Sequence, residues 1–214
     1  GVRHCLQQKY DGIVTAQFAV IMVIGLGSAA FHGTLTYIGQ QLDETPMVWL
    51  ILIGTYVLYA KEMKGNDWIR TASVYFLTFY GILFAVVHAV MQTTTSFQVH
   101  FGVLSVLSLV RMISLYNQTK LKDAKRILHR FIGAGLLGFG LWLMDQHLCS
   151  VMKSLPINPH GHVWWHFLMA YHAYLGAVFS MLVLAEENGE DPYVEWWYEL
   201  PFVYKHQQKL THKS

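Results

Sequence analysis

The feature that most constrains the fold is a series of long apolar runs, each ended by a short polar or charged segment. Six runs can be traced along the 214 residues, at about 13–32, 46–60, 68–91, 99–116, 131–148 and 162–184. A helix needs about 20 apolar residues to cross the hydrocarbon core of a bilayer, and most of these runs reach or approach that length. The sequence therefore predicts an all-α bundle of six membrane-spanning helices in a single domain, residues 1–214.

The composition supports a membrane protein over a soluble one. Charged residues make up 13% of the chain and hydrophobic residues 54%, whereas about 25% of the residues of an average soluble domain are charged. The formal net charge is only +2, which gives no reason to expect a nucleic-acid partner. The partner that the composition indicates is the lipid bilayer, and no protein partner can be named.

Lysine and arginine residues collect on one side of the predicted bundle. When the runs cross the membrane alternately, the N-terminal segment, residues 61–70, residues 117–130 and the tail take almost all of them, while Lys153 falls on the opposite side. Cytoplasmic loops of membrane proteins carry such an excess. We therefore expect both ends of the chain on the cytoplasmic side.

Ionisable residues from four distant segments fall at the opposite side. His162 and His166 lie one helical turn apart, so their imidazoles share one helix face and can bind the same ion. The best third ligand is His32, and Asp43 and Asp145 lie at the same depth. Ionisable groups inside membranes are costly and are usually functional. Metal binding is favoured over chance spacing among twelve histidines and over a pair that only forms hydrogen bonds at the membrane interface.

Asp43 is the candidate general base. The position after His162 is Val163 rather than glutamate, so the pair does not match the HExxH motif of soluble metalloproteases, and the base must come from another segment. The alternative role for Asp43 is a helix cap at the end of a polar loop, residues 33–45, before Pro46. Its neighbour Glu44 is interpreted as a solvated loop charge.

Other polar and aromatic residues near this end have two interpretations each. Ser28 precedes His32 by one turn and is either a polar partner or a small packing residue. Asp145 either orients a ligand histidine or forms a buried hydrogen bond. Trp164 and Trp165 suit the aromatic belt of a membrane interface, although one of them could wall a lipid pocket. Five further histidines are interpreted as structural or solvent-facing: His88, His100, His147, His160 and His172.

Three segments together resemble the alkaline ceramidase family: Ser28-Ala29-Ala30-Phe31-His32, Leu42-Asp43-Glu44-Thr45-Pro46-Met47 and His162-Val163-Trp164-Trp165-His166. These are zinc-dependent membrane amidases in a wider superfamily that includes adiponectin-type receptors. The resemblance implies hydrolysis of ceramide to a sphingoid base and a fatty acid. It implies three Zn²⁺ ligands, His32, His162 and His166. Asp43 would handle the proton of the nucleophilic water, and Ser28 would polarise or stabilise groups at the metal.

The sequence departs from the family pattern at its beginning. Family members have seven spans, and the first span, with the acidic Ca²⁺-binding segment that precedes it, has no counterpart here. We therefore expect an N-terminally truncated chain in which a Ca²⁺ site cannot be assigned, and in which Cys149 could pair with a cysteine of that segment. The resemblance also implies an endoplasmic reticulum or Golgi membrane with the site on the luminal side. Two alternatives stay open: a non-catalytic receptor with structural zinc, and a hydrolase of another membrane lipid.

Overall fold

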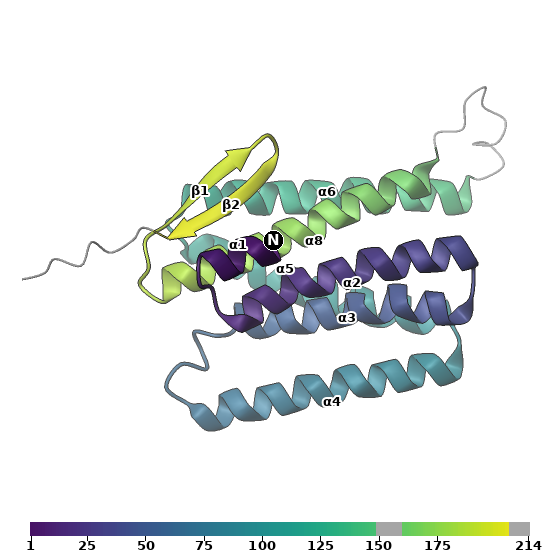
Figure 1. Ribbon diagram of the computed structural model, residues 1–214, viewed down its shortest axis with the longest axis horizontal. Coiled ribbons are helices and arrows are strands. Elements are labelled where there is room, and N and C mark those ends of the chain that lie inside the picture. The colour runs from purple at the N-terminus through teal and green to yellow at the C-terminus, as the bar shows by residue number, and fades with distance from the viewer. Residues whose placement is uncertain (149–159, 206–214) are drawn as a thin grey trace, which may run out of the picture.

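The computed structural model describes residues 1–148 and 160–205, and its long helices lie side by side along a common direction (Figure 1). The predicted loop containing Cys149 and Lys153 lies outside the described residues. In chain order the elements are α1 (Val2–Gln7), α2 (Gly12–Thr34), α3 (Tyr37–Leu58), α4 (Asp67–Met91), α5 (Thr94–Gln118), α6 (Lys122–His147), α8 (Gly161–Glu187), β1 (Pro192–Trp197) and β2 (Leu200–Lys205).

Five helices of the described residues are long and apolar enough to cross a membrane: α2, α4, α5, α6 and α8. The prediction of a multi-pass membrane bundle is thereby confirmed. The second predicted span, residues 46–60, corresponds to α3. This helix has 22 residues, but it is polar along its first third, so it is less apolar than the other five. Nevertheless α3 lies within the bundle, packed most extensively against α2 and also against α4 and α5.

The loop predicted for residues 33–45 is wrong, because most of it is the start of α3. The helix begins at Tyr37, and the Thr36 side chain caps it by accepting a hydrogen bond from the Gly39 amide at 3.2 Å. Pro46, predicted for the first turn, lies inside the helix instead. The polar residues of this segment resemble a loop in sequence, but packing against neighbouring helices makes them helical.

Pro46 lies near a close approach of α2 and α3. Proline has no amide hydrogen, so the carbonyl of Leu42, four residues earlier, has no helical donor. Gly27 of α2 packs against this carbonyl so tightly that a Cβ atom on Gly27 would lie 2.0 Å from the Leu42 oxygen. Farther along, a Cβ atom on Gly39 would lie 2.8 Å from Phe31 Cα. Small residues permit such close packing of membrane helices, and here they join the two helices that carry His32 and Asp43.

The basic end of the bundle differs from the prediction in two ways. The loop predicted for residues 117–130 is wrong, because α6 already begins at Lys122. The aromatic tail forms an antiparallel hairpin of β1 and β2, which the sequence pattern does not predict. The Trp196 ring of β1 lies under the guanidinium groups of Arg126 and Arg130 of α6, at 4.2 and 4.6 Å from the ring centroid. These cation–π contacts fasten the hairpin to the helix.

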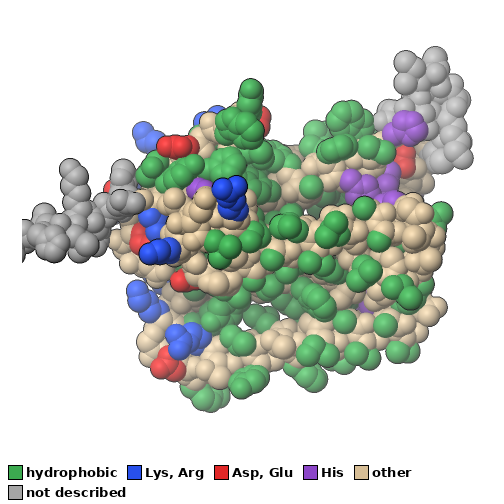
Figure 2. All heavy atoms as spheres, in the orientation of Figure 1, with side chains coloured by type: hydrophobic (Ala, Val, Ile, Leu, Met, Phe, Trp, Pro, Cys, Tyr) green, Lys and Arg blue, Asp and Glu red, His purple; other side chains and the backbone are tan. Residues whose placement is uncertain are grey.

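The two ends of the bundle have different chemistry. Lysine and arginine side chains gather at the end where α1 and the hairpin lie, and histidine side chains gather at the other end (Figure 2). The largest cluster of buried apolar side chains lies toward the basic end and joins α1, α2, α3, α5, α6, α8 and β2. Large apolar side chains are exposed along α4 and α5, as expected for faces that contact lipid.

Candidate metal centre

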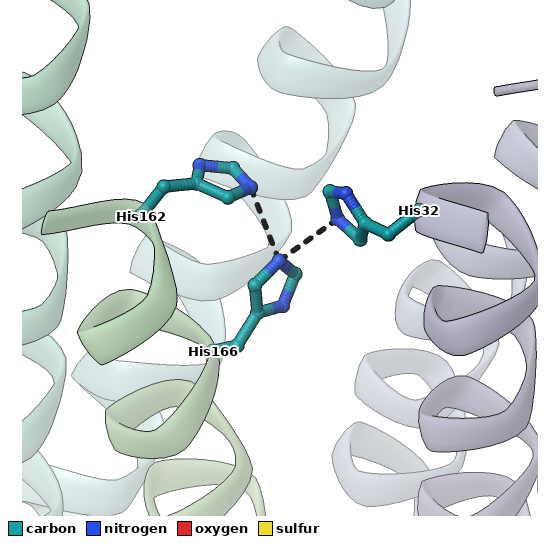
Figure 3. A group of neighbouring side chains, drawn as sticks. All are labelled: His32, His162 and His166. Atoms are coloured by element: carbon teal, nitrogen blue, oxygen red, sulfur yellow. Dashed lines mark hydrogen bonds between the residues drawn. The ribbon is translucent and has the colours of Figure 1, made fainter. Parts of the chain in front are cut away.

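Three histidines from two helices converge at the histidine end of the bundle. His32 lies in the last turn of α2, while His162 and His166 lie in the first two turns of α8, and the side chains point toward one another (Figure 3). His166 Nε2 is 2.9 Å from His32 Nε2 and 3.1 Å from His162 Nε2. The convergence follows from the topology, because α2 ends and α8 begins at the same end of the bundle.

The donor set fits a zinc ion. One ring nitrogen from each histidine lies within 4.8 Å of the others, and within residues 1–148 and 160–205 these three form a group able to hold a metal. Zinc takes imidazole nitrogens at about 2.0–2.1 Å in a tetrahedron, which places the ligand atoms roughly 3.3 Å apart. The observed separations are close to that value. Three protein ligands with an open fourth position are typical of catalytic zinc, whereas structural sites have four.

Ser28 and Asp43 lie beside this cluster. Ser28 Oγ is 3.5 Å from His166 Nδ1, the ring nitrogen that does not face the other histidines. Asp43 is buried, and its carboxylate interacts with the Ser28 hydroxyl and the His32 imidazole. A hydroxyl between a carboxylate and the outer nitrogen of a ligand histidine can fix the ring so that its Nε2 lone pair faces the metal.

Other predicted residues surround the cluster at a greater distance. The Asp145 carboxylate is close enough to act electrostatically on His162. The Trp165 ring stacks on His162 with centroids 5.5 Å apart and meets the His166 ring edge-on at 4.7 Å. Trp164 is exposed. Of the two tryptophans, Trp165 therefore walls the cluster and Trp164 faces outward, as a belt residue does.

The interpretation of Glu44 as a solvated loop charge is wrong. Its side chain is largely buried, and Glu44 Oε2 lies 2.8 Å from Nε2 of the fully buried His88 in α4. The Gln40 amide donates a hydrogen bond to the other oxygen of Glu44 at 3.1 Å. A buried charge needs such partners, and the contact fixes α3 against α4 on a face next to the one that carries Asp43.

A mainly apolar slot leads away from the cluster into the bundle. Its volume is about 680 Å³, and its lining includes His32, Asp43 and His166 at one end and Gln17 and Ser180 at the other. A cavity of this size is in the range that holds small ligands, which is about 300–1,000 Å³. The candidate metal centre thus lies at the mouth of a pocket suited to a hydrocarbon chain.

The family model described as Ceramidase matches residues 1–204 of this chain. The chain belongs to the ceramidase family. It is similar to an alkaline ceramidase of Arabidopsis thaliana, with 35% identity over 204 residues that cover 95% of this chain and 78% of that protein. Identity to alkaline ceramidase 3 of Mus musculus is 28%, covering 85% of this chain and 68% of that protein. Identity to alkaline ceramidase 1 of Homo sapiens is 25%, covering 91% and 74%.

The sequence predicts that Trp164 or Trp165 could wall a lipid pocket, but the other residues that line the slot of this ceramidase-family chain were not predicted, although their signal is present. Lining residues of α2 recur at helical spacing from Gln17 through Ile21, Gly25 and Ser28 to His32. Such a stripe of small, apolar and polar residues on one helix face is also what helix packing requires. The pattern alone therefore does not separate a cavity wall from a packed interface.

Proposed function

We propose that this chain hydrolyses the amide bond of ceramide to a sphingoid base and a fatty acid, using a zinc ion held by His32, His162 and His166. The observation that supports the proposal most directly is the convergence of three imidazole nitrogens beside a buried carboxylate at the mouth of an apolar slot. Membership of the ceramidase family, and the names of relatives such as the Arabidopsis thaliana alkaline ceramidase, support the substrate.

The three histidines provide the metal site. When bound, a zinc ion supplies Lewis acidity, which polarises a carbonyl oxygen and lowers the pKa of water. Trp165 restricts the side-chain motion of His162 and His166 through its ring contacts. Ser28 accepts the Nδ1 hydrogen of His166, which leaves Nε2 free to act as a ligand.

Asp43 carries the proton. Amide hydrolysis requires a base that takes a proton from the attacking water, and an acid that returns one to the departing amine nitrogen. Asp43 suits both tasks in turn, because its carboxylate faces the histidine cluster while the surrounding helices shield it from bulk solvent. The slot would hold one hydrocarbon chain and so bring the amide to the histidines. A substrate that lives in the bilayer would enter sideways between helices.

The Lys/Arg distribution supports an orientation. The end of the bundle that carries the basic side chains would face the cytoplasm, so the histidine end would face the lumen of the endoplasmic reticulum or Golgi. Ceramide would then be cleaved at the luminal leaflet.

Measuring bound zinc and ceramide turnover on the same purified preparations tests the proposal. His166→Ala should lose both, because two ligands rarely hold zinc. Asp43→Asn should keep the zinc and lose about 10²–10⁴-fold in rate, the usual share of acid–base catalysis. Ser28→Ala should lose less, about 10–100-fold, as partners of metal ligands typically do. The matched control is His147→Ala, an exposed histidine near the same end of the bundle, which should change neither quantity.

Two results would contradict the proposal in different ways. An Asp43→Asn protein with full zinc and undiminished hydrolysis would exclude Asp43 as the proton carrier. A zinc-replete wild type that cleaves no ceramide would favour the non-catalytic receptor or a hydrolase of another lipid, and a panel of membrane lipids would separate those two.

A further inference from the structure

We propose that the slot sets the maximum length of the hydrocarbon chain that the protein accepts, and that Gln17, Gly54 and Ser180 form its floor. The identification of this chain as part of ceramide rests on the proposed function. The existence of a floor rests on the cavity alone. The chain could be the acyl chain or the sphingoid chain, because both present the same methylene surface.

The slot follows one stripe on each of its lining helices. On α2 the stripe runs from Ser28 near the histidines to Gln17, eleven positions or about 16 Å at 1.5 Å per residue. On α3 it runs from Asp43 past Gly54 to Leu58, fifteen positions or about 22 Å. On α8 it runs from His166 to Ser180, fourteen positions or about 21 Å. The slot is therefore long and narrow, and parallel to the helices.

The floor is a polar contact between three helices. Ser180 Oγ of α8 donates a hydrogen bond to Gln17 Oε1 of α2 at 3.0 Å, and both residues are only 2% exposed. Gly54 of α3 completes the floor, because a Cβ atom there would lie 3.2 Å from Gln17 Nε2. Leu58 of α3 and Met112 of α5 also line the slot at this lower end, and both belong to the buried apolar cluster that fills the interior beyond it.

The depth corresponds to a definite range of chain lengths. An extended hydrocarbon chain advances about 1.25 Å per carbon, from a bond length of about 1.5 Å and a bond angle of about 111°. Depths of about 16–22 Å thus accommodate roughly 13–18 carbons in extended form. By contrast, a Cβ atom on Gly25, about two turns above the floor on α2, would meet open space. The obstruction to a longer chain therefore lies at the floor and not along the α2 wall.

A contact between Gln17 and Ser180 could also serve only to join α2 and α8. Substitution distinguishes the two roles. Loss of a purely structural contact weakens the binding of chains of every length equally, whereas loss of a floor changes how binding depends on chain length. Ser180 Oγ also lies 2.9 Å from the Ala177 carbonyl oxygen, so Gln17→Ala leaves the hydroxyl with a partner.

Two substitutions with opposite expected effects test the floor. Gly54→Leu raises it, so binding of chains near the upper length limit should weaken by at least tenfold while binding of short chains changes less than twofold. Gln17→Ala lowers it, so the longest chain accepted should increase by several carbons. Gly140→Leu is the matched control, because nothing lies within 4 Å of a Cβ atom at Gly140 in α6 and this residue does not line the slot.

The readouts separate this inference from the proposed function. Thermal stabilisation of the full chain by free fatty acids of increasing length measures the slot without requiring turnover. Ceramide hydrolysis is then measured with the acyl chain varied at a fixed sphingoid base, and with the base varied at a fixed acyl chain. A shift of the length limit in either series supports the floor and identifies the inserted chain. A length profile that neither Gly54→Leu nor Gln17→Ala moves overturns the inference, even if ceramide is hydrolysed. If no ceramide is cleaved but the fatty-acid profile shifts, the proposed function fails and the floor stands.

Discussion

Replacing Gly27 by alanine tests whether the close approach of α2 and α3 positions the candidate site. The added Cβ atom would lie 2.0 Å from the Leu42 carbonyl oxygen and 3.0 Å from the Asp43 amide nitrogen, and ordinary contact begins at 3.4 Å. Both neighbours are backbone atoms that cannot rotate away. The two helices must therefore separate by about 1.4 Å, and overpacking of this kind typically costs about 1–3 kcal/mol of the free energy of unfolding.

The same separation moves Asp43 away from Ser28 and His32. A displacement of about 1 Å at a reacting group can reduce a rate about 10²-fold, so Gly27→Ala should lose ceramide turnover to that extent while it still binds zinc. Stability, bound zinc and turnover are measured together in one detergent. Gly33→Ala, on the same helix, is the control, because its Cβ atom would meet nothing within 4 Å. Unchanged turnover in Gly27→Ala would refute the link between this helix contact and the site.

Three further predictions concern other parts of the molecule. Glu44→Leu should reduce the free energy of unfolding by about 1–3 kcal/mol, because His88 then remains buried without its partner; chemical denaturation measures this, and an unchanged midpoint would contradict it. Removal of zinc by a chelator should lower the melting temperature and abolish hydrolysis, because an ion that binds only the folded chain stabilises the folded state. If added zinc restored neither the melting temperature nor hydrolysis, the result would count against a zinc site. Trp196→Ala should loosen the hairpin, because the cation–π contacts of its ring with Arg126 and Arg130 contribute about 0.5–1 kcal/mol each. Hydrogen exchange should then accelerate in β1 and β2, while ceramide turnover stays unchanged.

The fold was largely predictable, because the apolar runs are long and the bilayer permits few structures for them. The errors lie where polar residues are helical. The polarity of residues 33–45 and 117–130 predicts loops, yet α3 begins at Tyr37 and α6 at Lys122. In both segments neighbouring helices or the hairpin bind the polar groups. Those partners are distant in sequence, so local composition carries no sign of them.

The members of the candidate site were predicted for a different reason. Their spacing of four residues places His162 and His166 on one face of the same helix. The alternation of spans across the membrane places His32 and Asp43 at the same end of the bundle. The distance between Asp43 and His32 could not be predicted, because it depends on how closely Gly27 lets α2 approach α3. The contact between Glu44 and His88 could not be predicted either, because nothing in the sequence around His88 indicates that it meets α3. The catalytic roles stay predictions until the substitutions above are measured.

The origin of the three histidines has a consequence for biosynthesis. His32 and His166 lie 134 positions apart, on the earliest and the last of the long helices described. A translocon releases helices in the order of synthesis, so the nascent chain contains one histidine of the cluster until α8 emerges. With one histidine the growing chain offers too few ligands to hold a zinc ion. The candidate metal centre therefore cannot be loaded before the last of the long helices described is in place.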